Sequence, residues 1–488
     1  MSWKDTAEPL LTRMPSVARP DRHVPFKRKL GWTAGVLVLY FFLTNVYLFG
    51  LGTGGADAFG RFRSILAGGQ GTIMQLGIGP IVTASIVLQL LGGADLLGLD
   101  TQNNPRDQVL YQGLQKVLVL VMIALTGLPM VFAADFLPAQ PVLGLGTTGT
   151  KWLMFAQIAV GGVLILYMDE VISKWGVGSG IGLFIIANIS QSLVGGLIAI
   201  PQIAGNWGVI PYWIAAAVGI VEAPSVLTSQ GLMRLLFEQS GRNYIGLIAI
   251  VTTVSIFVIV VYAESVRVEI PLSHARVKGA RGRFPVKLIY ASVLPMILVR
   301  AIQMNVQFLG RLLNSQLQTM PAWLGTYSNG SPTGGLFYYL APIQSPGQWA
   351  WFLGGVSQPV WKVLLRVGID LTFMVIGGAI FAVFWVETTD MGPEATAQQI
   401  QNSGMQIPGF RQSPGVLEKV LGRYIPQVTV IGGALVGLLA VMANMLGTIG
   451  GVTGTSLLLT VSITYKLYEE IAEEQLIEMH PMMRQMFG

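Results

Sequence analysis

The chain has 488 residues, of which 52% are hydrophobic and 11% are charged, whereas a soluble protein of this size has about 25% charged residues. The absence of cysteine excludes disulfides, thiol catalysis and cysteine-ligated metal sites. The net charge of +6 is small, so its distribution along the chain is more informative than its total. These values are typical of a membrane protein with several spans.

The first 30 residues are polar and end in the basic cluster 27–29. The apolar run that follows is long enough to cross a bilayer and lacks an Ala-x-Ala cleavage site. We therefore expect residues 1–30 to be a cytosolic N-terminal segment and the following run to be a retained first span.

Ten apolar runs are close to the roughly 20 residues that a helix needs to cross the hydrocarbon core. The expected spans are residues 31–51, 72–91, 113–132, 152–168, 180–200, 245–263, 288–309, 367–386, 428–446 and 450–465. The run 208–221 is short and contains Pro211, so we expect an external loop there, as a partly buried hairpin. With the N-terminus inside the cell, 21 of the 30 Lys and Arg residues fall on the inner side and 8 on the outer side. Positive loops stay inside, so both termini are predicted to be cytoplasmic.

The spans divide into two groups of five, in residues 31–242 and 243–467, and a cytosolic tail, 468–488, follows. Because five is odd, the two groups must have opposite topologies, as in inverted repeats. The second span of each group has a proline among bulky aliphatic residues, Pro80 and Pro295. The predicted fold class is an all-α polytopic membrane protein with two inverted five-helix halves.

The segment 57–71 precedes the second span on the outer side, carries two arginines and is too short to cross the membrane. Two interpretations are open. It is either a plain loop or a short helix that folds back into the outer mouth, with glycines at both ends that would let it move.

Two glycine-rich spans carry aliphatic residues four positions apart, Ile78 and Val82 in one and Ile181 and Ile185 in the other. Residues four apart share a helix face. By itself the pattern favours ordinary helix packing, in which small residues allow close approach. It is also compatible with a hydrophobic constriction that gates a pore by excluding water and ions.

Between the sixth and seventh spans lies a basic segment, 264–287, with six Lys or Arg residues. Four of them are spaced by glycines and predict a protruding tip: Arg276, Lys278, Arg281 and Arg283. Such a tip suits RNA phosphates or acidic protein surfaces, whereas anionic lipid and topology alone are competing explanations. A second inner segment, 387–426, carries Arg411 after a Pro-Gly turn signal.

Ionisable residues are scarce within the spans. Arg300 lies in the seventh span, where it either snorkels to the interface or faces a water-filled outer vestibule. The acidic residues Asp169, Glu170, Asp370 and Glu387 are expected at or near span ends. No metal, cofactor or nucleophile motif is evident, which argues against catalysis and against simple ion coupling. A small-solute transporter with inverted repeats and a polar midplane site remains the main alternative to a channel, ahead of an intramembrane enzyme.

Seven stretches, in order and nearly end to end, resemble the SecY family of protein-conducting channels of the general secretory pathway, and most of all its archaeal members. They are residues 76–84 (LGIGPIVTA), 167–185 (YMDEVISKWGVGSGIGLFI), 261–264 (VYAE), 384–389 (FWVETT), 403–411 (SGMQIPGFR), 423–426 (RYIP) and 468–470 (YEE). One departure is Val268-Glu269 after Arg267, where related sequences often continue with a basic residue.

The resemblance implies a clamshell of ten helices around an hourglass pore. The pore is closed by a ring of aliphatic side chains, which the motifs carry over to Ile78, Val82, Ile181, Ile185, Ile297 and Leu439. A plug helix is implied at about 57–67, with Phe59, Arg61, Phe62, Arg63, Ile65 and Leu66. A lateral gate is implied between spans two and three on one side and spans seven and eight on the other.

The implied function is that of the central subunit of the secretory translocon, which is a passive channel and not an enzyme. It exports polypeptides and releases hydrophobic segments sideways into lipid, without a cofactor. The implied partners are a SecE-type gamma subunit, a small beta subunit, the ribosome, the signal-recognition-particle receptor system, signal sequences, nascent chains and membrane lipid. The implied location is the cell (plasma) membrane. Segments 264–287 and 387–426 are the implied docking loops, and Arg411 matches a notable arginine of the family.

Overall fold

The computed structural model describes most of the chain. The described residues are 3–22, 24–52, 66–93, 97–99, 104–132, 137–142, 144–201, 206–221, 235–237, 239–240, 243–274, 281–288, 294–317, 320–328, 331–353, 356, 358–389, 391–402, 405–406 and 414–479. They form two compact units. The first consists of Met1–Gly195, Ala301–Ala341 and Ile463–Gly488, and the second of Gly196–Arg300 and Pro342–Ser462.

Three of the four boundaries between the units fall inside helices, α7 (Gly180–Ile198), α12 (Leu294–Gln316) and α17 (Gly454–Met479). Each of these helices therefore contributes residues to both units. The units are defined by packing and follow a different division from the sequence halves 31–242 and 243–467, so the inverted repeat stays a prediction.

Five further helices build the first unit. They are α1 (Trp3–Leu11), α2 (Phe26–Thr44), α4 (Gly79–Gly93), α5 (Pro105–Phe132) and α6 (Thr147–Trp175). Helix α5 packs against α1, α4 and α6, and α2 packs against α6. Glycine permits one close approach, because a Cβ atom on Gly161 of α6 would lie 2.0 Å from the carbonyl oxygen of Ile73. A hairpin of β5 (Thr326–Ser328) and β6 (Ser331–Gly334) precedes α13 (Leu336–Tyr339).

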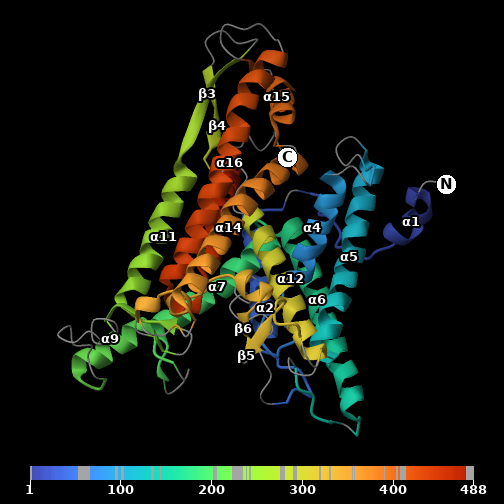
Figure 1. Ribbon diagram of the computed structural model, residues 1–488. Coiled ribbons are helices and arrows are strands. Elements are labelled where there is room, and N and C mark those ends of the chain that lie inside the picture. The colour runs from blue at the N-terminus through green and yellow to red at the C-terminus, as the bar shows by residue number, and fades with distance from the viewer. Residues whose placement is uncertain are drawn as a thin grey trace. The chain divides into compact units, whose positions relative to one another are not determined.

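In the second unit, helices α11 (Leu247–Ser265), α14 (Val360–Thr388) and α16 (Pro414–Leu446) run side by side (Figure 1). Glycine again sets the distance between helices, because a Cβ atom on Gly433 would lie 2.5 Å from the carbonyl oxygen of Gly378. Without side chains there, α14 and α16 pack backbone to backbone, as small residues allow in membrane helices.

One end of α14 and α16 carries a small domain that joins the two predicted docking loops (Figure 1). Strand β3 (Arg267–His274) pairs with β4 (Arg281–Lys287) on one side and with β7 (Met405–Gln406) on the other. Helix α15 (Pro393–Asn402) packs on α16 beside this sheet. Ile270, Val286 and Leu421 share its hydrophobic core. Much of the segment 387–426, expected as a loop, is therefore helical.

The remaining elements are short. They are α9 (Val209–Val218), β1 (Gln239–Ser240), β2 (Asn243–Tyr244) and the 3₁₀ turns η2 (Pro346–Gln348), η3 (Trp351–Leu353) and η4 (Ile449–Gly451). The run 208–221, expected as a loop or hairpin, contains α9, which at ten residues and about 15 Å is too short to cross a bilayer. The indole nitrogen of Trp213 binds the carbonyl oxygen of Ile245 at 3.0 Å and ties α9 to the start of α11.

Each of the ten expected spans contains a helix. Six helices of the described residues are long and apolar enough to cross a membrane: α5, α6, α7, α11, α14 and α16. The helices in the other four expected spans, α2, α4, α12 and α17, do not meet these criteria of length and apolar composition. Helix α4 has 15 residues because it begins only at Gly79, after the turn that contains Gly77 at φ +54°. Helices α2, α12 and α17 carry several charged or polar residues within their lengths.

Candidate functional site

The end of the predicted plug lies directly against a predicted ring residue. Leu66 is buried, and its carbonyl oxygen accepts a hydrogen bond of 2.7 Å from the backbone N–H of Ile78. Gly77 makes this approach possible, because a Cβ atom there would lie 2.0 Å from the same oxygen. Ile78 is 1% exposed, and it accepts the first helical bond of α4, from the N–H of Val82 at 3.0 Å.

We call residues 66–78 the anchor turn. Its second residue, Ala67, has a positive φ of 51°, which residues with a Cβ atom rarely adopt. The Ala67 carbonyl oxygen accepts a hydrogen bond of 2.9 Å from the hydroxyl of Tyr40 on α2. The Tyr40 ring stacks on Phe184 of α7, with 4.9 Å between ring centroids. Nothing in the sequence indicates that Tyr40 binds Ala67, because a tyrosine in an apolar helix is typical of packing.

The two ring candidates of α7 are positioned by the preceding helix. The backbone N–H of Ile181 donates to a carboxylate oxygen of Asp169 at 2.9 Å, which satisfies one of the unpaired donors of the first helical turn. Ile181 is half-buried and Ile185 is fully buried. The two residues are four apart in one helix, so they share a face. Asp169, noted in the sequence only as a span-end acid, therefore orients the start of α7.

The other ring candidates belong in whole to the second unit. Ile297 is buried on α12, and Leu439 is half-buried on α16. Their part in a common ring stays a prediction. The plug residues Phe59, Arg61, Phe62, Arg63 and Ile65 lie outside the described residues.

Of the basic docking candidates, some lie inside and some outside the part of the chain that the structure describes. Arg276, Lys278 and Arg411 lie outside the described residues. Arg281 and Arg283 belong to β4, where they pair in register with Ser273 and Pro271 of β3. Two of the four basic residues that were expected in a protruding tip therefore belong to a strand.

Arg300 neither snorkels nor faces a vestibule, contrary to both expectations from the sequence. Its side chain is 2% exposed, and its Nε donates to the Thr455 hydroxyl at 3.0 Å. Its Nη1 lies 3.7 Å from an oxygen of Asp370, whose other oxygen accepts the N–H of Ile343 at 3.1 Å. Asp370 is the eleventh residue of α14 and is buried, so it is not at a span end. A charge so far from water is tolerated because it is paired and hydrogen-bonded.

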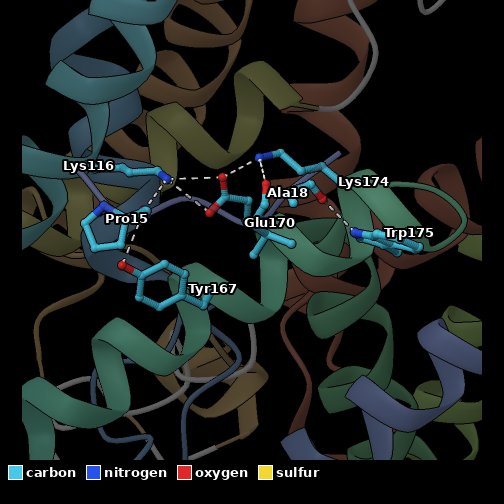
Figure 2. A network of polar contacts seen from close by, with 8 residues as sticks. Pro15, Ala18, Lys116, Tyr167, Glu170, Lys174 and Trp175 are labelled. Atoms are coloured by element: carbon cyan, nitrogen blue, oxygen red, sulfur yellow. Dashed lines mark hydrogen bonds and ion pairs between the residues drawn. The ribbon is translucent and has the colours of Figure 1, made fainter. Parts of the chain in front are cut away.

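A second polar network in the first unit centres on Glu170 of α6 (Figure 2). Lys116 of α5 lies 3.1 Å from both carboxylate oxygens, and Lys174, one helical turn beyond Glu170, lies 2.7 Å from one of them. The three side chains are 14–17% exposed, so solvent screens the interaction less than at the surface. Glu170 thus joins α5 to α6.

The same lysines bind the N-terminal strap, which we define as residues 3–22 (Figure 2). Three side chains of α5 and α6 donate to its backbone: Lys116 to the carbonyl of Pro15 (2.8 Å), Lys174 to that of Val17, and Trp175 to that of Ala18 (2.8 Å). Ion pairs of Lys4 with Asp107 and of Arg106 with Glu8 fasten its helix α1 to α5. Among the described residues, no group of three or more His, Asp or Glu side chains could hold a metal ion.

Known proteins match this chain over its whole length. The family model for SecY covers residues 72–468, and the model for the plug domain of Sec61p covers residues 38–71. The protein translocase subunit SecY of Haloarcula marismortui is 74% identical over 493 residues, which cover 100% of both chains. The protein of the same name from Archaeoglobus fulgidus is 49% identical, covering 99% of this chain and 98% of its own.

Comparison with solved structures leads to the same family. A protein-conducting channel, 36% identical, superposes with a TM-score of 0.78 over 97% of this chain and 98% of its own. Sec61 of the canine ribosome-channel complex from the endoplasmic reticulum, 34% identical, superposes with a TM-score of 0.76 over 97% of this chain and 98% of its own. The ten-helix fold expected from the sequence is therefore the SecY fold. The chain belongs to the SecY family, as an archaeal-type protein translocase channel subunit with a plug domain.

Proposed function

We propose that this chain forms the pore through which unfolded polypeptides cross the cell membrane, with both of its termini in the cytoplasm. Membership of the SecY family and six long apolar helices support a multi-pass channel. The excess of Lys and Arg on the expected inner side, 21 of 30, supports the orientation.

The observation that carries the proposal is the 2.7 Å bond between the Ile78 N–H and the Leu66 carbonyl. It joins the end of the predicted plug to the first residue of the proposed ring. Aliphatic side chains make no fixed hydrogen-bond demands, so they can close around any chain and exclude water when none is present. The proposed ring consists of Ile78, Val82, Ile181, Ile185, Ile297 and Leu439.

A lateral gate completes the proposed mechanism. In the family arrangement it separates the second and third spans from the seventh and eighth. A segment of about 20 apolar residues gains free energy by leaving the pore for lipid, whereas a polar segment does not. The channel itself supplies no energy, so a ribosome or another driving process must push or pull the chain.

The proposed partners follow from the family and from the sheet β4-β3-β7. A SecE-type gamma subunit and a small beta subunit would complete a heterotrimer. Arg281 and Arg283 belong to strand β4 of a sheet built from both docking loops, and positive charge on this sheet would suit a ribosome's phosphates. The solved Sec61 in the canine ribosome-channel complex, 34% identical, supports this choice. The signal-recognition-particle receptor system would deliver signal sequences and nascent chains, and the lateral gate would open to membrane lipid.

Deletion of residues 59–66 tests the plug and the pore together. The full-length channel complex and the deleted form are reconstituted in planar bilayers, and ion conductance is recorded without a translocating chain. We expect frequent openings only in the deleted form, because the seal then depends on the ring alone. Equal conductance of the two forms would contradict the plug assignment.

A further inference from the structure

Tyr40 lies where three parts of the first unit meet. Its hydroxyl donates to the Ala67 carbonyl oxygen at 2.9 Å, and both residues lie within the plug match 38–71. Its ring stacks on Phe184, with 4.9 Å between centroids and 27° between the ring planes. The side chain is fully buried, at 0% exposed. A buried hydroxyl aimed at a backbone carbonyl is costly to place unless the bond is made, so the contact is specific.

The backbone that Tyr40 binds is held in an unfavourable conformation. Ala67 has a φ of 51°, where its Cβ atom crowds the following carbonyl. Such residues persist where the surroundings hold them. Here the holding bonds are Tyr40 to Ala67, Ile78 N–H to the Leu66 carbonyl (2.7 Å), and Gly69 N–H to the Met74 carbonyl (3.1 Å). The anchor turn is therefore poised to relax when one of them is lost.

We propose that Tyr40 is a positioning residue that latches the plug in the closed channel. Its hydroxyl holds the Ala67 carbonyl and thereby keeps the end of the plug stretch against Ile78. The proposal rests on the proposed function, since it takes residues 57–67 as the plug and Ile78 as part of the ring. The bond from Tyr40 to Ala67 stabilises the closed state alone. The Ala67 carbonyl is buried in that state and becomes hydrated once the anchor turn moves.

The stacked ring gives the latch a means of release. Phe184 immediately precedes the ring candidate Ile185 on α7, and both side chains are fully buried. An incoming chain that widens the ring must displace α7, which shifts Phe184 against the Tyr40 ring. Because stacking fixes where the hydroxyl points, this displacement weakens the bond to Ala67. Opening of the ring and release of the plug are thereby coupled through one side chain.

Tyr40→Phe removes the hydroxyl and keeps the ring, so it tests the latch directly. The variant channel complex is reconstituted in planar bilayers and its open probability is measured without a translocating chain. We expect an increase of about two- to tenfold over the unmodified channel, the effect of one lost hydrogen bond. Phe184→Leu keeps the hydroxyl but removes the stacked partner, and we expect a smaller increase.

Tyr47→Phe is the matched control, because Tyr47 follows α2 and its side chain is 70% exposed. It should leave the open probability unchanged. An increase for Tyr40→Phe alone, at an unaltered melting temperature in detergent, supports the latch. Equal open probabilities of Tyr40→Phe and the unmodified channel would overturn it, provided that deletion of residues 59–66 opens the channel. If that deletion also has no effect, the plug assignment fails as well. Equal increases for both tyrosine variants would likewise overturn the latch.

Discussion

Ile78 combines two tasks in one residue. Its side chain is a proposed member of the ring, and its backbone N–H holds the Leu66 carbonyl at 2.7 Å. The side chain supplies a seal without polar demands, whereas the backbone supplies a directional bond that fixes the plug end. Replacing the side chain therefore tests the ring while the backbone bond remains available.

Replacement of Ile78, Val82 and Ile185 by Gly should open the seal to ions. We expect conductance in planar bilayers to rise on the order of tenfold, because a hydrophobic constriction works by excluding water. Glycine also costs about 1 kcal/mol at each helical position. The matched control is therefore a triple Gly variant at the exposed residues Leu125, Val160 and Val194. Equal conductance of the two triple variants would remove the ring assignment.

The buried pair of Arg300 and Asp370 should behave as a unit in stability. Arg300→Met leaves a buried carboxylate without its charge partner, which costs about 3–5 kcal/mol of unfolding free energy. Arg300→Met combined with Asp370→Leu removes both charges and should recover most of that loss. Denaturant unfolding in mixed micelles measures both variants. If the double variant is no more stable than Arg300→Met alone, the pair does not carry the stability assigned to it.

At the scale of elements, the N-terminal strap fastens α5 to α6. Glu170→Gln removes the charge that binds Lys116 and Lys174, and charged hydrogen bonds of this kind contribute about 1.5–3 kcal/mol. Cleavage by trypsin at Arg13, Arg19 and Arg22 should therefore accelerate on the order of tenfold. Glu8→Gln is the control, since its pair with Arg106 is 37–49% exposed and worth about 1 kcal/mol or less. Indistinguishable cleavage of the two variants would show that Glu170 does not hold the strap.

The sheet β4-β3-β7 should bind ribosomes as one surface. Charge reversal of Arg281, Arg283 and Arg411 to Glu should weaken binding on the order of tenfold at low salt, with a smaller difference at high salt. Lys362→Glu is the control, because Lys362 lies near the start of α14 and the sheet lies near its other end. Cosedimentation with ribosomes at fixed salt measures the effect. Unaltered binding would leave membrane topology as the only role of these arginines.

At the scale of the whole molecule, the sequence was most informative about the spans. Each of the ten expected runs contains a helix, because long apolar stretches have few alternatives in a bilayer. The residues at which the helices begin and end were less predictable. The expected ninth span, 428–446, begins within α16, which starts at Pro414 and extends into the docking domain. The polar residues 414–427 hide this helix from a search for apolar runs.

Contacts between distant residues could not be predicted. Asp370 is 70 positions from Arg300, and nothing in either span indicates that they meet. The pairing of β7 with β3 joins two loops that the sequence separates by two complete spans. Tyr40 and Asp169 act on the backbones of Ala67 and Ile181, and such bonds have no sequence pattern. These contacts depend on tertiary packing rather than on local periodicity.

Polypeptides are proposed to pass between the ring residues, and crosslinking tests this passage most directly. The chain has no cysteine, so single cysteines are placed at Ile78, at Ile185 and, as a control, at the exposed Val194 of α7. A stalled secretory nascent chain with one cysteine is then oxidised in the channel. We predict disulfides at Ile78→Cys and Ile185→Cys only when the chain carries a signal sequence, and none at Val194→Cys. Crosslinks at Val194→Cys alone, or crosslinks independent of the signal sequence, would contradict the account.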